Sequence, residues 1–174
     1  MRKIYKSKIG NILLESDGEN IIRCEFVDDF VKYEDDDEII EKCVKYLDDY
    51  FDGKNAGKFQ HIKIEKSDYT SKILRLVCDI SYGKTKTYSD IKEEYEKIYG
   101  KKTSARSVGR AVGSNDLMIL VPCHRVVGKN NKLTGYKFGI EKKKYLLDLE
   151  QNHKPSVNIW AMFTKLQQMF SSDF

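Results

Sequence analysis

The sequence predicts an α/β protein of the α+β kind, in which a small antiparallel sheet with one helix precedes a mostly helical unit. Short apolar or alternating segments separated by turn residues occupy residues 1–27, and apolar residues recur at helical spacing later in the chain. The charge also changes sign. Residues 1–66 carry 12 basic and 16 acidic side chains, whereas residues 67–174 carry 19 and 11. Such asymmetry indicates a polyanionic partner for the second half.

Length and composition narrow the classes of protein. The 174 residues suffice for one sizeable domain or two small ones, and 40% hydrophobic with 33% charged residues is typical of a soluble globular protein. No apolar run approaches the length of a membrane span, and residues 1–20 lack the apolar core of a signal peptide. We therefore expect a cytoplasmic protein that does not bind membranes.

Cysteines and histidines are few and scattered. They are Cys24, Cys43, Cys78 and Cys123, with His61, His124 and His153. Because none of them shows the spacing of a disulfide framework or a metal site, the sequence predicts a reducing compartment and no metal. Cys24 and Cys43 lie on predicted apolar faces, as structural cysteines do.

The first half predicts a three-stranded meander and a helix. Residues 4–5, 12–15 and 21–27 are the expected strands, with turn residues between them. Acidic residues 35–38 then precede an apolar stripe at helical spacing that ends near Gly53. This stripe consists of Ile39, Ile40, Cys43, Val44, Leu47, Tyr50 and Phe51. Residues 59–64 could form one more strand, and we expect no site residue in this half.

The second half predicts three helices in succession. Ser67 or Asp68 caps the first helix, whose apolar face is Ile73, Leu74, Val77, Cys78 and Ile80. Thr87 or Ser89 precedes the second helix, residues 90–99, with Ile91, Tyr95 and Ile98 directed inward and Gly100 ending it. The third, residues 105–112, lies between Ser104 and Gly113. Two short helices joined by a loop are typical of a helix-turn-helix.

Small residues and two arginines characterise the third helix. Ala105, Ser107, Gly109 and Ala111 allow close approach to another surface, and Arg106 and Arg110 add charge. The pattern fits a surface that binds a polyanion, and it equally fits a tight helix-packing face with two solvated arginines.

The segment 121–127 holds the most distinctive chemistry. An apolar run over residues 117–121 is stopped by Pro122, and Cys123 and His124 follow. A thiolate is the nucleophilic form of cysteine, and a nearby imidazole can accept its proton. The alternative is a buried structural cysteine, and neighbouring residues need not be hydrogen bonded to each other.

Residues 122–127 resemble the active-site signature of the O6-alkylguanine-DNA alkyltransferases, and the likeness continues without a gap over residues 105–150. It implies a ribonuclease H-like first unit (1–66), a winged helix-turn-helix DNA-binding and alkyltransferase unit (67–152) and a tail (153–174). It also implies a monomer without a cofactor. Such a protein moves a methyl or larger alkyl group irreversibly, once per molecule, from O6 of guanine in double-stranded DNA to Cys123, flipping the nucleotide from the minor groove.

The resemblance also implies roles for individual residues. His124 is the base, acting through a water, Glu150 orients it, Tyr136 donates to the leaving guanine and Asn115 is a hinge. The DNA-binding residues are Tyr88, Ser89, Ala105, Arg106, Ser107, Gly109, Arg110 and Lys129. The substrate-pocket residues are Val126, Lys137 and Phe138. This chain departs from the pattern by about four extra residues within 95–103. Some relatives also have serine or glycine where Lys137 or Phe138 stands here.

The tail and two rival functions complete the expectations. Residues 153–174 predict a short amphipathic segment that covers an apolar patch or binds a partner. A non-reacting lesion sensor of the alkyltransferase-like type would conflict with the presence of Cys123. A thiol hydrolase would need an oxyanion motif, and none is visible in the sequence.

Overall fold

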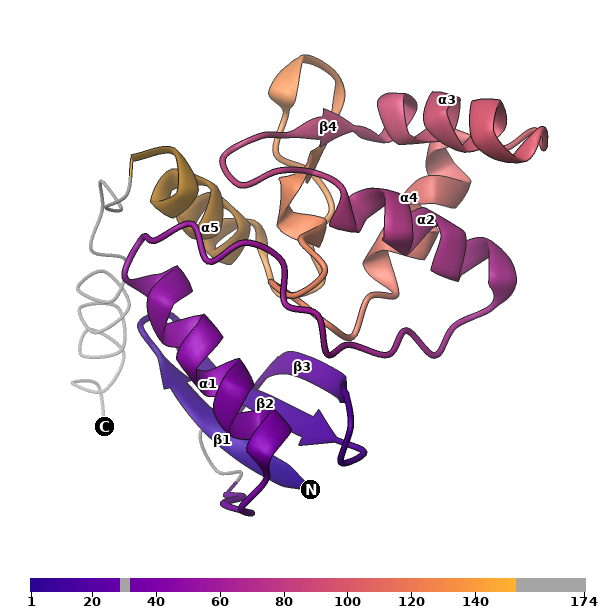
Figure 1. The fold of residues 1–174 in the computed structure, drawn as a ribbon. Helices are drawn as coiled ribbons and strands as arrows, with labels where there is room; N and C mark the ends of the chain where they lie inside the picture. Colours follow the sequence, from indigo (N-terminus) through magenta and orange to yellow (C-terminus); the bar gives the residue numbers. More distant parts are fainter. Residues whose placement is uncertain (29–31, 153–174) are drawn as a thin grey trace, which may run out of the picture.

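The computed structural model describes residues 1–28 and 32–152, so the predicted tail segment lies outside the described residues (Figure 1). A three-stranded antiparallel sheet, in the order β1 (Arg2–Ser7), β2 (Gly10–Ser16), β3 (Ile21–Val27), confirms the predicted meander. The central strand is largely buried and carries a register irregularity at its end, between Glu15 and Ser16. Helix α1 (Glu38–Phe51) packs against this sheet.

Helix α1 begins and faces the core as the acidic run and the apolar stripe predict. Asp37 is the N-cap, and its carboxylate accepts a hydrogen bond of 2.8 Å from the backbone N–H of Ile40. The side of α1 that meets the sheet buries Ile40, Cys43, Leu47 and Tyr50 almost completely.

The expected strand over residues 59–64 is wrong. Only Ile62 pairs with the sheet, as an isolated parallel bridge to Ile21. The reason lies just before Ile62. The Phe59 ring packs on the ring of Tyr46, and the Tyr46 hydroxyl donates to the Gly57 carbonyl at 3.1 Å. The chain is therefore held against α1 and meets the sheet at one residue.

The second unit is mostly helical. Its helices are α2 (Asp68–Cys78), α3 (Tyr88–Tyr99), α4 (Ala105–Gly113) and α5 (Ile140–Asn152). Strands β4 (Lys86–Thr87) and β5 (Val126–Val127) form a short parallel pair, and 3-10 turns occupy Cys123–Arg125 and Lys129–Asn131. Helices α2, α3 and α4 pack against one another, and α3 and α4 are joined by the loop 100–104, which confirms the helix-turn-helix (Figure 1).

Side-chain hydroxyls cap these helices. Ser67, Thr87 and Ser104 cap α2, α3 and α4, and Thr87 forms a capping box with Asp90. Gly100 ends α3 in the left-handed region with φ 64°.

Ile98 was expected to face inward, and the structure corrects this because its residue surface is 60% exposed. Ile91 and Tyr95 do face the core. At the end of α3 it is Tyr99 that turns toward α2. Its ring packs on the ring of Tyr95 in the same helix, with centroids 5.0 Å apart, and lies beneath the ammonium of Lys72 from α2.

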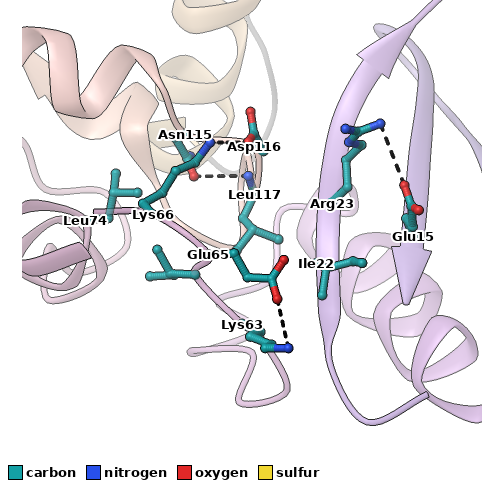
Figure 2. Close-up of a pocket in the computed structure, with 11 residues that line it drawn as sticks. Glu15, Ile22, Arg23, Lys63, Glu65, Lys66, Leu74, Asn115, Asp116 and Leu117 are labelled. Carbon is teal, nitrogen blue, oxygen red and sulfur yellow. Dashed lines mark hydrogen bonds and ion pairs between the residues drawn. The ribbon is translucent and has the colours of Figure 1, made fainter. Parts of the chain in front are cut away.

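The two units meet along the free edge of β3. The Cys24 backbone accepts from Met118 N–H at 2.9 Å and donates to the Asp116 carbonyl at 2.7 Å, so the segment before the cysteine motif is tied to the sheet. A cavity of about 170 Å³ lies beside this junction, between β3 and the segments 63–66 and 115–117, and Figure 2 draws the residues that line it. At its rim Lys66 is paired with Asp116. No helix in the described part of the chain is long and apolar enough to span a bilayer.

Candidate active site

Two tight turns deliver Cys123 to its position. Ile119 has φ 68°, and Leu120 N–H donates to Met118 O at 2.8 Å across it. A branched residue in the left-handed region is strained by about 1–3 kcal/mol. Pro122 then has φ −78° and ψ 61°, and Cys123 N–H donates to Val121 O at 2.7 Å. The chain reverses sharply, and Cys123 keeps 6% of its surface exposed.

Glu150 is the centre of a buried polar cluster. Its carboxylate accepts from His124 Nε2 at 2.6 Å and from Gly83 N–H at 3.0 Å. Arg125 adds a forked interaction, with Nε at 2.9 Å from Oε2 and Nη2 at 3.0 Å from Oε1. Burial alone would raise the pKa of Glu150, but the interactions with His124 and with the Arg125 guanidinium outweigh it and lower that pKa. The carboxylate is therefore ionised.

This geometry defines the protonation of His124. Because an ionised carboxylate can only accept, Nε2 carries the ring proton and Nδ1 is left with a lone pair. Nδ1 is buried and has no hydrogen-bond partner among the described residues. Burial and Arg125 lower the pKa of His124, against the opposing effect of Glu150. The resting imidazole is a neutral base.

The thiol itself is protonated at rest. Burial raises the pKa of Cys123, and a hydrogen bond with Asn115 and the charge of Lys143 act against that shift. Lys143 is fully buried, and its ammonium donates to Val126 O at 2.5 Å and Thr134 O at 2.9 Å. Burial lowers the pKa of Lys143 to about 8. A cation thus lies near the sulfur and braces the loop that follows it.

Asn115 links the helical unit to the cysteine segment. Its side-chain amide donates to Val121 O at 3.0 Å, and its carbonyl oxygen accepts from Leu117 N–H at 3.0 Å. This bridge spans the strained turn at Ile119.

Tyr136 lies close to the sulfur of Cys123. Its hydroxyl is buried, and burial followed by the neighbouring thiols of Cys123 and Cys24 raises the pKa of the phenol well above its usual value. It is therefore a neutral donor at physiological pH.

The expected pocket residues have other partners as well. Lys137 donates to Glu25 at 2.7 Å and to Asp116 at 3.1 Å, and Phe138 packs edge-on against Phe26 with ring centroids 5.5 Å apart. Both side chains thus contact β3 or its neighbours. Val126 is fully buried.

The expected DNA-binding residues lie on α4 and at the start of α3, except for Lys129, which lies in the 3-10 turn Lys129–Asn131. The Arg106 side chain is exposed and makes no hydrogen bond or ion pair with the residues that the structure describes. Arg110 is also exposed and reaches Ser107 at 3.4 Å.

The Tyr88 ring lies against Gly109 of α4, where a Cβ would be 3.7 Å from the ring, an ordinary van der Waals contact. The Tyr88 hydroxyl is near the carbonyls of Thr134 and Gly135 at 3.4 and 3.3 Å. Ala105 and Ser107 are partly buried, and Ser89 and Lys129 are exposed.

Three side chains of the cluster are not among the predicted site residues. Arg125 was signalled by its charge inside a buried apolar segment, and Lys143 by its helical spacing from Leu146 and Glu150, which places all three on one face of α5. Tyr50 comes from α1, in the half where no site residue was expected. Its hydroxyl donates to Glu150 Oε1 at 2.8 Å, and nothing in the sequence marks it apart from the other apolar positions of that helix.

Comparisons with known proteins agree with this site. Residues 68–152 match the family described as 6-O-methylguanine DNA methyltransferase, DNA binding domain, and residues 1–65 match the ribonuclease-like domain of the same name. The inducible methylated-DNA–protein-cysteine methyltransferase of Bacillus subtilis is 37% identical over 125 residues, covering 72% of this chain and 68% of that protein. That of Methanosarcina barkeri is 32% identical over 156 residues, covering 86% and 96%.

A solved structure extends the likeness to the fold. The crystal structure of Mycobacterium tuberculosis OGT in complex with DNA superposes with a TM-score of 0.77 at 30% identity, over 89% of this chain and 95% of that one. With both units matched in sequence and most of the fold shared, the chain belongs to the 6-O-methylguanine DNA methyltransferase family.

Proposed function

We propose that this protein repairs double-stranded DNA by moving a methyl or larger alkyl group from O6 of guanine to the sulfur of Cys123. The observation that supports this best is the buried turn Cys123–Arg125, in which a protonated thiol is followed directly by a neutral imidazole. That imidazole is hydrogen bonded to Glu150, and its proton-free Nδ1 lacks a partner among the described residues. The likeness of the chain to proteins named methylated-DNA–protein-cysteine methyltransferase supports the same reaction.

The chemistry follows from these protonation states. His124 Nδ1 accepts the thiol proton through a water molecule, and the imidazolium is stabilised by Glu150. The thiolate then attacks the alkyl carbon, so that an S–C bond forms while the bond from that carbon to O6 breaks. Guanine leaves as an anion, and the neutral phenol of Tyr136 donates a hydrogen bond to a ring nitrogen. Because a thioether is stable, each molecule reacts once and needs no cofactor.

Access to the lesion requires the nucleotide to leave the duplex, at a cost of a few kcal/mol. We assign Arg106 to the gap that the flipped nucleotide leaves in the duplex, because this exposed guanidinium projects from α4 without an internal partner in the described structure. Small residues on α4 allow it to enter the minor groove, where little sequence information is available. Tyr88 would press on the adjoining backbone, and Ser89, Arg110 and Lys129 would meet phosphates.

The remaining assignments complete this proposal. The protein acts as a monomer built from a unit of residues 1–66 and an alkyltransferase unit of residues 67–152. Asn115 is the hinge between α4 and the cysteine segment, a role supported by its two hydrogen bonds across the strained turn. Val126, Lys137 and Phe138 border the space that receives the flipped base.

Mass spectrometry tests the proposal directly. Incubation of the protein with duplex DNA that carries O6-methylguanine should add about 14 mass units, the difference between hydrogen and methyl on one sulfur, and the modified peptide should contain Cys123. Cys123→Ser should remain unmodified and still bind the DNA. DNA binding by the wild-type protein with no adduct would instead identify a lesion sensor, and the absence of both DNA binding and adduct would leave the thiol hydrolase.

A further inference from the structure

Tyr50 is a buried phenol that reaches the site from the other unit. It lies in the last turn of α1, is 1% exposed, and donates to Glu150 Oε1 at 2.8 Å. The same hydroxyl oxygen is 3.2 Å from His124 Nε2. Glu150 is 100 residues away in the sequence, so this contact exists only because the units pack together.

The protons around these atoms can be assigned. The ionised Glu150 accepts from His124 Nε2–H and from the Tyr50 hydroxyl on the same oxygen, Oε1. The phenol therefore directs its hydrogen at Glu150 and its lone pairs toward the Nε2–H of His124. His124, Glu150 and Tyr50 thus form a closed arrangement, in which the proton on Nε2 has two acceptors, the Glu150 carboxylate and the Tyr50 hydroxyl oxygen.

Packing holds the phenol in place. Its ring is edge-on to the rings of His124, Tyr82 and Phe51, with centroid separations of 6.3, 6.1 and 5.5 Å. Because the α1 backbone and three rings fix the Tyr50 ring, its hydroxyl is a preorganised partner for the imidazole.

We propose that Tyr50 is a positioning residue for alkyl transfer, which holds His124 in the Nε2–H tautomer and keeps Nδ1 free to accept the thiol proton. This proposal rests on the proposed function, because it assumes that His124 activates Cys123. It gives the ribonuclease-like unit a part in the chemistry, acting through Glu150 and His124 and without touching the substrate.

Tyr50→Phe is the informative variant because it removes one oxygen and leaves the ring. We expect its single-turnover rate constant for alkylation of Cys123 to fall about tenfold, the usual effect of a lost hydrogen bond to a charged group, with DNA affinity unchanged. Tyr46→Phe is the matched control. Tyr46 lies one turn earlier on α1, and within the described residues its hydroxyl donates only to the Gly57 carbonyl, at 3.1 Å. The control should react at the wild-type rate.

The pH dependence separates positioning from packing. Around His124 lie Glu150 and Lys143 from α5, Cys123 and Arg125 from its own turn, and Tyr50 from α1, beside which Tyr82 packs. The hydrogen bond from the phenol partly offsets the negative charge of Glu150. Without this donor the carboxylate attracts the protonated imidazole more strongly, which raises the pKa of His124. The acid limb of the rate profile should therefore move to higher pH in Tyr50→Phe and stay in place in Tyr46→Phe.

Nitrogen NMR of the wild-type protein gives a test that does not depend on the variant folding. The imidazole shifts of His124 should show the Nε2–H tautomer, with a slowly exchanging Nε2 proton that has a nuclear Overhauser contact to the Tyr50 hydroxyl. An Nδ1–H tautomer, or a Tyr50→Phe protein with the wild-type rate and pH profile, would overturn the proposal. If the wild-type protein itself fails to alkylate Cys123, the proposed function fails instead.

Discussion

Polar side chains around Glu150 are hydrogen bonded within the protein, whereas the Arg106 side chain on the outer face of α4 is not hydrogen bonded within the described structure. In the interior the carboxylate accepts from four different residues, His124, Arg125, Gly83 and Tyr50, before any substrate arrives. On α4 the Arg106 guanidinium has no hydrogen bond or ion pair within the described structure. A reacting group needs its geometry prepared in advance, whereas a group that binds DNA must keep its donors available.

The largest expected effect comes from breaking the interior. Glu150→Gln removes the charge that compensates Arg125, whose side chain is only 8% exposed. An uncompensated buried charge typically costs about 3–5 kcal/mol, so we expect a loss of this size in the free energy of unfolding by urea. Glu141→Gln, on an exposed position of the same helix, should change it by less than about 0.5 kcal/mol. Equal stabilities of the two variants would contradict the central role of Glu150.

The α4 face should respond differently. Arg106→Ala should lower the rate of repair in duplex DNA by about 10- to 100-fold, because we propose that this side chain fills the gap of a flipped nucleotide. Reaction with free O6-benzylguanine should change by less than about twofold, since no duplex has to be opened. Both rates can be measured in single-turnover assays.

Arg110→Ala is the control for charge alone. It should weaken binding to any duplex and reduce the slope of log affinity against log salt by about 1. Equal losses on duplex and free base for Arg106→Ala would remove it from the DNA-opening role.

The pH dependence of the reaction rate distinguishes the interior from the α4 face, because the titrating group, His124, is in the interior. Burial lowers the pKa of His124, so the imidazole remains a neutral base below its ordinary value of 6.5. The rate of reaction with free O6-benzylguanine should therefore fall with decreasing pH about a midpoint below 6.5. A midpoint above 6.5 would mean that Glu150 outweighs burial and that His124 is charged at rest.

Linkage predicts that folding follows the same direction. The unfolded chain binds a proton at His124 near pH 6.5 while the folded protein does not, so stability is complete above that pH and decreases as the pH falls through the window below it. Unfolding by urea at a series of pH values measures this, and His124→Gln should flatten the dependence.

The smallest effect is expected at Ile98, which belongs to neither region. With 60% of its surface exposed, Ile98→Lys should change the free energy of unfolding by no more than about 0.5 kcal/mol and leave transfer unaffected. Ile91→Ala is the counterpart at a fully buried position of α3 and should cost about 2–5 kcal/mol. A large effect at Ile98 would indicate that this side chain packs against something.

The errors in the sequence prediction have a common origin. Residues 59–64 have the alternation of a strand, yet the contact between Phe59 and Tyr46 holds them on α1. Ile98 fits the helical period, but α2 meets the end of α3 through Tyr99. Periodicity tells which side of a segment is apolar, and it does not tell where the neighbouring element ends.

The sequence by itself determined the meander, the capped helices and the segment 121–127, because turn residues, caps and hydrophobic periods act over a few neighbouring positions. Only the tertiary structure decided that Arg125, Lys143 and Tyr50 join the cysteine site. Their hydrogen bonds to Glu150, Val126 and Thr134 cross from one element to another, and Tyr50 arrives from a helix 100 residues before its partner. The partners of a buried charge are the groups that packing brings close to it, and the neighbouring sequence positions do not show which groups these are.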